Sequence, residues 1–123
     1  MGAIRIEDMG VLKGEVALYG GPYSNAHATR AFLDGCDGFA IPPERRICTG
    51  DCVAYGAHPV ETVALIRARG GVVVAGNCER QLATGAGDCG CGFAPGTACD
   101  RLSAAWYAHA DRALGPELRG WMA

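Results

Sequence analysis

The sequence predicts an α/β fold, with a mostly parallel β-α-β-α-β sheet and flanking helices, as a single domain over residues 1–123. Two observations lead to this prediction: three short strand-like runs each end in a glycine-rich turn, and helical patterns separate the runs. Strands that alternate with helices are typical of parallel sheets with right-handed crossovers. The length of 123 residues fits one domain of ordinary size.

The three predicted strands are residues 15–19, 46–49 and 72–75. The turns that follow them begin at Gly20, Gly50 and Gly76. The third run is apolar throughout, which is typical of a strand that is covered on both faces. We therefore expect residues 72–75 to be covered on both faces.

Two helices are predicted between the strands. The first covers residues 25–33, with Ser24 or Asn25 as its N-cap. The second covers residues 59–69, because proline suits the first helical position and a Gly-Gly pair follows the last turn. The residues of the second helix expected to face the core are Val60, Val63, Ala64 and Ile66.

The C-terminal third has a different pattern. Residues 84–99 are rich in glycine and cysteine and predict an irregular loop. A helix is expected from Asp100, its N-cap, and a short final helix over residues 117–123. The apolar residues of the longer helix recur at four-residue spacing, at Leu102, Trp106, Ala110 and Leu114.

Composition and charge exclude several classes of protein. With 11 basic and 13 acidic side chains the net charge is −2, which argues against a nucleic-acid partner. Because no apolar run approaches the length of a membrane span and no secretion signal is recognisable, we expect a cytoplasmic protein without a membrane partner. An odd count of seven cysteines does not predict a disulfide framework, so they are buried small residues, metal ligands or reactive thiols.

Polar side chains follow the second and third predicted strands. Asp51 follows the second strand, and Asn77 and Glu79 follow the third. In an open parallel sheet the turns at the carboxyl ends of the strands share one edge, where ligands bind. We therefore expect these three side chains to converge at that edge.

Four segments resemble the calcineurin-like metallophosphoesterase superfamily, and most closely its small bacterial phosphodiesterases. The segments are PYSNAHATRAFL at 22–33, GDCVAYGAHPVETVALIRARG at 50–70, VVVAGNCERQL at 72–82 and WYAHADRALGPELRGWMA at 106–123. The resemblance implies the N-terminal half of a helix-flanked β-sandwich, and hydrolysis of phosphate mono- or diesters by two divalent ions, commonly Mn, Fe or Zn. It also implies that the chain is incomplete at its C-terminus, because the family's later histidine motifs are absent.

The resemblance assigns two metal ligands to this chain. Asp51 occupies the position of the bridging carboxylate and Asn77 that of an amide-oxygen ligand. Gly21 and Tyr23 stand where the family has an aspartate and a histidine, so the set of ligands is incomplete.

The resemblance also suggests catalytic and substrate-binding positions. Cys78 stands where the family has a histidine that interacts with substrate, and the acidic residue after it is present as Glu79. The substrate-binding candidates are Gly21, Tyr23 and Asn25. His58 either caps the second helix or acts as a ligand near Asp51.

The crowded cysteines leave several interpretations open. The set Cys78, Cys89, Cys91 and Cys99 has the spacing C-x10-C-x-C-x7-C, which predicts a zinc site, a redox pair or unmetallated thiols. Cys52 and Cys78 both follow strands, so they are expected to approach each other, and a thiolate at a helix N-terminus has a lowered pKa.

Three hypotheses follow for the function. The first is a divergent or truncated metallophosphoesterase-like hydrolase that acts on a small phosphate ester, with the missing ligands supplied by a second copy or a complementing chain. The second is a non-catalytic binding or scaffold module with the same fold and a cysteine-bound zinc. The third is thiol redox chemistry at Cys52 or Cys78.

Overall fold

A parallel sheet of three short strands organises the chain in the computed structural model, which describes residues 4–123 and leaves the first three residues of the predicted domain outside the description. The strands are β1 (Ala17–Tyr19), β2 (Arg46–Cys48) and β3 (Val72–Val73), in the order β1-β2-β3. Both strand pairs are parallel, so the predicted α/β class and strand direction are confirmed.

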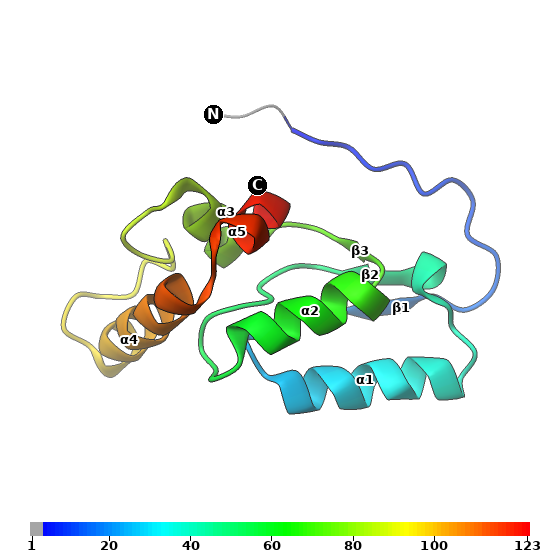
Figure 1. Cartoon of the computed structure of the whole chain (residues 1–123), viewed down its shortest axis with the longest axis horizontal. Coiled ribbons are helices and arrows are strands. Elements are labelled where there is room, and N and C mark those ends of the chain that lie inside the picture. The colour runs from blue at the N-terminus through cyan, green and yellow to red at the C-terminus, as the bar shows by residue number, and fades with distance from the viewer. Residues whose placement is uncertain (1–3) are drawn as a thin grey trace.

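Helices α1 (Ala26–Gly38) and α2 (Pro59–Arg69) connect the strands and lie side by side along the sheet (Figure 1). Because the strands are added in one direction by crossovers of one hand, both helices cover the same face. The other face leaves Leu18 66% and Val74 57% exposed. The expectation that residues 72–75 are covered on both faces is therefore wrong.

The two helices begin where the sequence predicts. The Asn25 side chain accepts the backbone N–H of Ala28, so Asn25 rather than Ser24 caps α1, which continues past residue 33 to Gly38. The bounds of α2 agree with the prediction, but Val60 is 39% exposed. The buried face of α2 instead consists of Pro59, Thr62, Val63 and Ile66.

A buried arginine ties the start of β2 to both helices. Arg46 is 1% exposed, and its guanidinium donates to the carbonyl oxygens of Ile41 and Arg69 at 2.8 Å each. It also donates to Asp37 Oδ1 at 2.6 Å. Arg46 therefore holds β2 to α1 and α2. In the sequence it stands out only as one of two adjacent arginines, Arg45 and Arg46.

Three helices form the C-terminal part: α3 (Asn77–Thr84), α4 (Ala98–Ala113) and α5 (Pro116–Met122). The sequence does not predict α3, and the N-cap of α4 is Thr97 rather than Asp100. Tyr107 is buried and Leu102 is exposed, which differs from the predicted stripe, although Ala110 and Leu114 are buried as expected.

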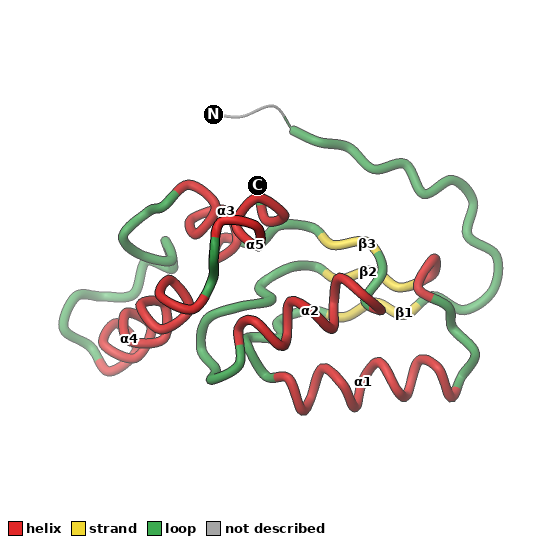
Figure 2. The backbone as a smooth tube through the Cα atoms, viewed as in Figure 1, coloured by secondary structure: helices red, strands yellow, loops and turns green. Residues whose placement is uncertain are grey.

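One hydrophobic core joins the carboxyl-end edge of the sheet to α2 and the C-terminal helices. Its members include Cys48, Cys52, Val63, Ile66, Cys78, Leu82, Tyr107, Leu114 and Met122. Figure 2 shows a long loop between α3 and α4 on the side toward which the strands point. Among residues 4–123, no helix has the length and hydropathy that crossing a bilayer requires.

Candidate functional site

The turns that follow β1 and β2 are joined by backbone hydrogen bonds. The N–H of Gly21 donates to the Gly50 carbonyl at 3.1 Å, and that of Tyr23 donates to the Asp51 carbonyl at 3.0 Å. The turn after β3 packs on the same residues, because a Cβ at Gly76 would overlap the Asp51 carboxylate. The predicted convergence of the three turns at one sheet edge is confirmed.

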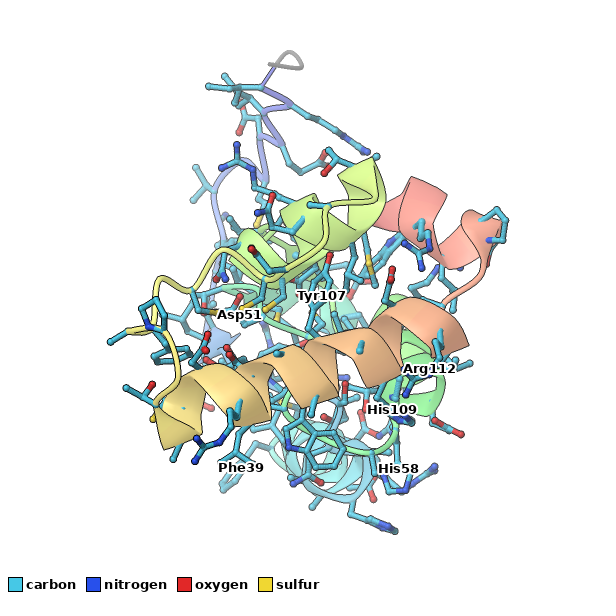
Figure 3. The ribbon with its side chains drawn as sticks, turned by 90° about the vertical axis from the view of Figure 1, so that its left-hand side faces the viewer. Phe39, Asp51, His58, Tyr107, His109 and Arg112 are labelled. Atoms are coloured by element: carbon cyan, nitrogen blue, oxygen red, sulfur yellow. The ribbon has the colours of Figure 1, made fainter. Side chains whose placement is uncertain are left out.

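This edge contains a pocket of about 360 Å³, which we call the edge pocket. Its lining consists of Tyr23, Asp51, Tyr55, Asn77, Cys78, Cys91 and Phe93. Figure 3 views the carboxyl-end side and shows Asp51 beside the loop that joins α3 and α4. The structure thus brings Asp51 and Asn77 together, as the sequence predicts, and adds Cys78 and residues of the loop.

Asp51 is held in an unusual conformation. Its φ of 57° lies in the left-handed region, and the preceding Gly50 has φ 100°. Its Oδ1 atom is buried and has no hydrogen-bond partner among the described residues. Because an unpartnered buried carboxylate oxygen is costly, this atom marks the place where the site can receive a cation or a donor.

Glu79 explains how the turn at Asp51 is held. The carboxylate is 1% exposed and accepts the backbone N–H groups of Asp51, at 3.2 Å, and of Cys52. Glu79 lies in the first turn of α3, where the helix dipole favours a negative charge. Its geometry is that of a residue that positions Asp51, and a catalytic role for Glu79 stays a prediction.

Asn77 connects the edge to the loop after α3. Its Nδ2 donates to the Cys89 carbonyl oxygen at 2.7 Å and lies 3.3 Å from Cys91 Sγ. Because the amide nitrogen is used in this way, the amide oxygen is the atom of Asn77 left for a cation.

The cysteines separate into groups. The Sγ atoms of Cys78, Cys89 and Cys91 all lie within 4.8 Å of one another. Cys99 is exposed, and Cys52 lies beside Cys48 with their Sγ atoms 3.9 Å apart. Of the four cysteines in the predicted spacing, three form a cluster and Cys99 lies outside it, and the approach of Cys52 to Cys78 stays a prediction.

The environments of these thiols differ. Burial raises the pKa of the Cys78 thiol. The hydrogen bond with Cys48, together with burial, raises the pKa of the Cys52 thiol. The expected lowering at these two positions is wrong. Burial also acts on Cys91, but hydrogen bonds with Cys89, Tyr55 and Asn77 outweigh it and lower the pKa of the Cys91 thiol.

The substrate-binding candidates line a second pocket, of about 520 Å³, which includes Gly21, Tyr23 and Asn25. Asn25 uses its side-chain oxygen to cap α1. His58 lines this second pocket, with its ring 5.3 Å from that of His27, and makes no side-chain cap of α2. It does not line the edge pocket. Tyr23 lines both pockets.

Two residues of the edge pocket, Tyr55 and Phe93, are not among the site residues predicted from sequence. Tyr55 lies within the segment at 50–70 that carries the family resemblance, so the motif offered a signal for it. Phe93 belongs to the irregular loop, and no local pattern indicates that this loop folds back onto the sheet edge.

Comparison with known proteins supports the fold. No family model and no curated protein matches the chain. Among solved structures, the crystal structure of a metallophosphoesterase from Sphaerobacter thermophilus matches with a TM-score of 0.56 and 20% sequence identity. The match covers 87% of this chain and 39% of that chain, so this chain spans about two fifths of that protein's length. The chain therefore has the fold of part of a metallophosphoesterase.

A two-metal centre needs more ligands than the described residues supply at this edge. Gly21 has no side chain, and burial together with the neighbouring Asp51 raises the pKa of Tyr23, which keeps its phenol neutral. Asp51 and Asn77 remain as candidate oxygen ligands. This donor set fits one hard divalent cation and does not fit two.

Proposed function

We propose that this chain binds a small phosphate ester through one divalent cation held by Asp51 and Asn77, as part of a metallophosphoesterase-type hydrolase. The observation that supports this most is the buried, unpartnered Oδ1 of Asp51, a residue that lines the edge pocket together with Asn77. Two protein oxygens suit a hard cation that fills its other positions with water and substrate phosphate.

The surrounding residues keep the Asp51 carboxylate in place. Glu79 accepts the N–H of Asp51, which supports its left-handed backbone conformation. Gly76 leaves room for the carboxylate, since a side chain there would overlap Oδ1. These contacts orient the Asp51 carboxylate before any cation binds.

Other groups of the pocket suit a phosphate ester. The neutral phenol of Tyr23 lines the pocket and can donate its O–H to a phosphate oxygen. Asn77 is the first residue of α3, and a helix N-terminus favours anions. Phe93 and Tyr55 offer apolar surface to the organic part of the ester. A bound divalent cation would neutralise charge on the phosphoryl group and would lower the pKa of a bound water.

Calorimetric titration of the reduced full chain with Mn²⁺ tests the cation site. We expect one ion per chain, and a loss of at least about tenfold in affinity for Asp51→Asn. Asp34→Asn, which changes an exposed carboxylate on α1, is the matched control and should bind as the wild type does. Equal affinity of the wild type and Asp51→Asn would overturn the proposed site.

Release of p-nitrophenol from bis-p-nitrophenyl phosphate with Mn²⁺ tests the hydrolase. We expect turnover in the wild type and in Asp34→Asn, and none above background in Asp51→Asn. Binding of Mn²⁺ without turnover would reject the hydrolase and leave a cation-binding module.

A further inference from the structure

Three thiols meet at the edge pocket although they come from two different segments. Cys78 lies in the first turn of α3, and Cys89 and Cys91 lie in the loop that follows this helix. Their Sγ atoms are all within 4.8 Å of one another. Cys78 and Cys89 are buried and Cys91 is half-buried.

The loop backbone is shaped to aim two sulfurs in one direction. Gly90 and Gly92, which flank Cys91, have φ of 70° and 73° in the left-handed region. Glycine adopts this conformation without strain. The resulting path places Cys89 and Cys91 together against Cys78.

Hydrogen-bonding groups from outside the loop lie against these sulfurs. The Tyr55 hydroxyl lies 2.7 Å from Cys91 Sγ and 3.5 Å from Cys89 Sγ. Asn77 Nδ2 lies 3.3 Å from Cys91 Sγ and binds the Cys89 carbonyl. The Asn77 amide nitrogen can only donate, and a donor directed at sulfur favours the thiolate, which is the form that binds metal.

We propose that Cys78, Cys89 and Cys91 form a site for a thiophilic divalent ion of the Zn²⁺ type. Zinc–sulfur bonds of about 2.3 Å in a tetrahedron place the sulfurs about 3.8 Å apart, so the observed cluster needs to contract by about 1 Å or less. On binding, each thiol loses its proton to solvent and its sulfur lone pair forms the bond to the ion.

The fourth position of this ion faces the edge pocket. Cys78 and Cys91 line that pocket together with Asp51 and Tyr23, whereas Cys99 is exposed and outside the cluster. Three protein ligands and one open position are typical of a zinc ion that exchanges water or a small ligand, rather than of a closed structural site. The soft thiol site and the hard oxygen site at Asp51 thus adjoin and select different metals.

Cobalt and zinc titration of the reduced, metal-stripped full chain tests this site. We expect one Co²⁺ per chain with sulfur-to-cobalt charge-transfer absorption, and displacement of the cobalt by one equivalent of Zn²⁺. Cys91→Ser should weaken Zn²⁺ binding by at least about tenfold in competition with a chromophoric chelator. Cys99→Ser is the matched control and should bind Zn²⁺ as the wild type does.

Cys91 is the informative position because it is only half-buried, and circular dichroism of Cys91→Ser checks that the chain still folds. Mn²⁺ binding at Asp51 should persist in Cys89→Ser, because Cys89 belongs to the thiol cluster but does not line the edge pocket, and this result separates the thiol site from the proposed phosphate-ester site. Absence of thiolate–cobalt absorption, an equal effect of Cys99→Ser, or an iron–sulfur chromophore in the purified protein would overturn the proposal. A mass lower by two hydrogen atoms, which indicates a disulfide within the cluster under the titration conditions, would overturn it too.

Discussion

Replacing Glu79 by glutamine tests how the buried carboxylate holds Asp51. Glu79 is 1% exposed and accepts two backbone N–H groups, those of Asp51 and Cys52. Glutamine keeps one acceptor oxygen and turns the other into an NH₂ group that faces a backbone donor. One N–H therefore keeps a neutral hydrogen bond, and the other loses its partner.

The expected cost follows from these two contacts. A hydrogen bond to a charged group contributes about 1.5–3 kcal/mol, and a neutral one about 1 kcal/mol. Loss of one bond and weakening of the other should lower the free energy of unfolding by about 2–5 kcal/mol. This is a large share of the total stability of about 5–15 kcal/mol that is usual for a domain.

Urea unfolding of the reduced protein, followed by circular dichroism, measures this cost. Glu117→Gln is the matched control, because Glu117 also lies in the first turn of a helix but its ion pair with Arg67 is exposed. Its substitution should change the stability by at most about 0.5 kcal/mol. Equal stabilities of Glu79→Gln and Glu117→Gln would refute the structural role of the buried carboxylate.

Three further predictions concern other parts of the molecule. Arg46→Met should lower the free energy of unfolding by about 3–5 kcal/mol, because it leaves buried carbonyl oxygens without a donor, and a loss below about 1 kcal/mol in urea unfolding would contradict this. Gly76→Ala should abolish calorimetric Mn²⁺ binding by displacing Asp51, whereas Gly87→Ala, which has open space for a methyl group, should bind normally; equal binding by both variants would argue against the steric account. Burial raises the pKa of Tyr107 from 10.0 to about 12, so the folded state holds the phenolic proton more tightly than the unfolded state and stability should fall by about 2 kcal/mol between pH 10 and 12. Tyr107→Phe should show a smaller fall over that range in urea unfolding, and an identical fall in both proteins would reject this assignment.

The parts of the fold predicted from sequence are those that depend on local patterns. The strand-ending glycines and the Pro-to-Gly-Gly bounds of α2 are local signals, and the structure confirms them. The parallel order then follows from strand–helix alternation. The meeting of Asp51 and Asn77 follows in turn, since parallel strands end at one edge.

The parts that could not be predicted depend on contacts between distant residues. α3 starts at Asn77 without a side-chain cap, so its beginning reads as a turn. In α4, Tyr107 is buried and its hydroxyl donates to the Ala86 carbonyl at 2.6 Å, whereas Leu102 is exposed. The four-residue spacing of Leu102 and Trp106 therefore did not identify the buried face of this helix. The position of Cys91 depends on Tyr55 and Asn77, which belong to other segments.

The uncovered face of the sheet likewise depends on how distant segments are arranged. The apolar run at 72–75 cannot distinguish a strand buried on both faces from one whose second face is open. The two crossovers place α1 and α2 on one side, which leaves Leu18 and Val74 exposed. The strand order and the hand of the crossovers decide which face of the sheet is covered, and no short stretch of sequence shows either of them.

The most direct test of the account is paramagnetic broadening of the backbone amide NMR signals by substoichiometric Mn²⁺. If Asp51 and Asn77 hold the ion, the signals of Tyr23, Asp51 and Asn77 should broaden first, and those at the C-terminal end of α1 last. Broadening centred on the exposed carboxylates of α1, or spread evenly over the chain, would contradict a cation site at the carboxyl-end edge of the sheet.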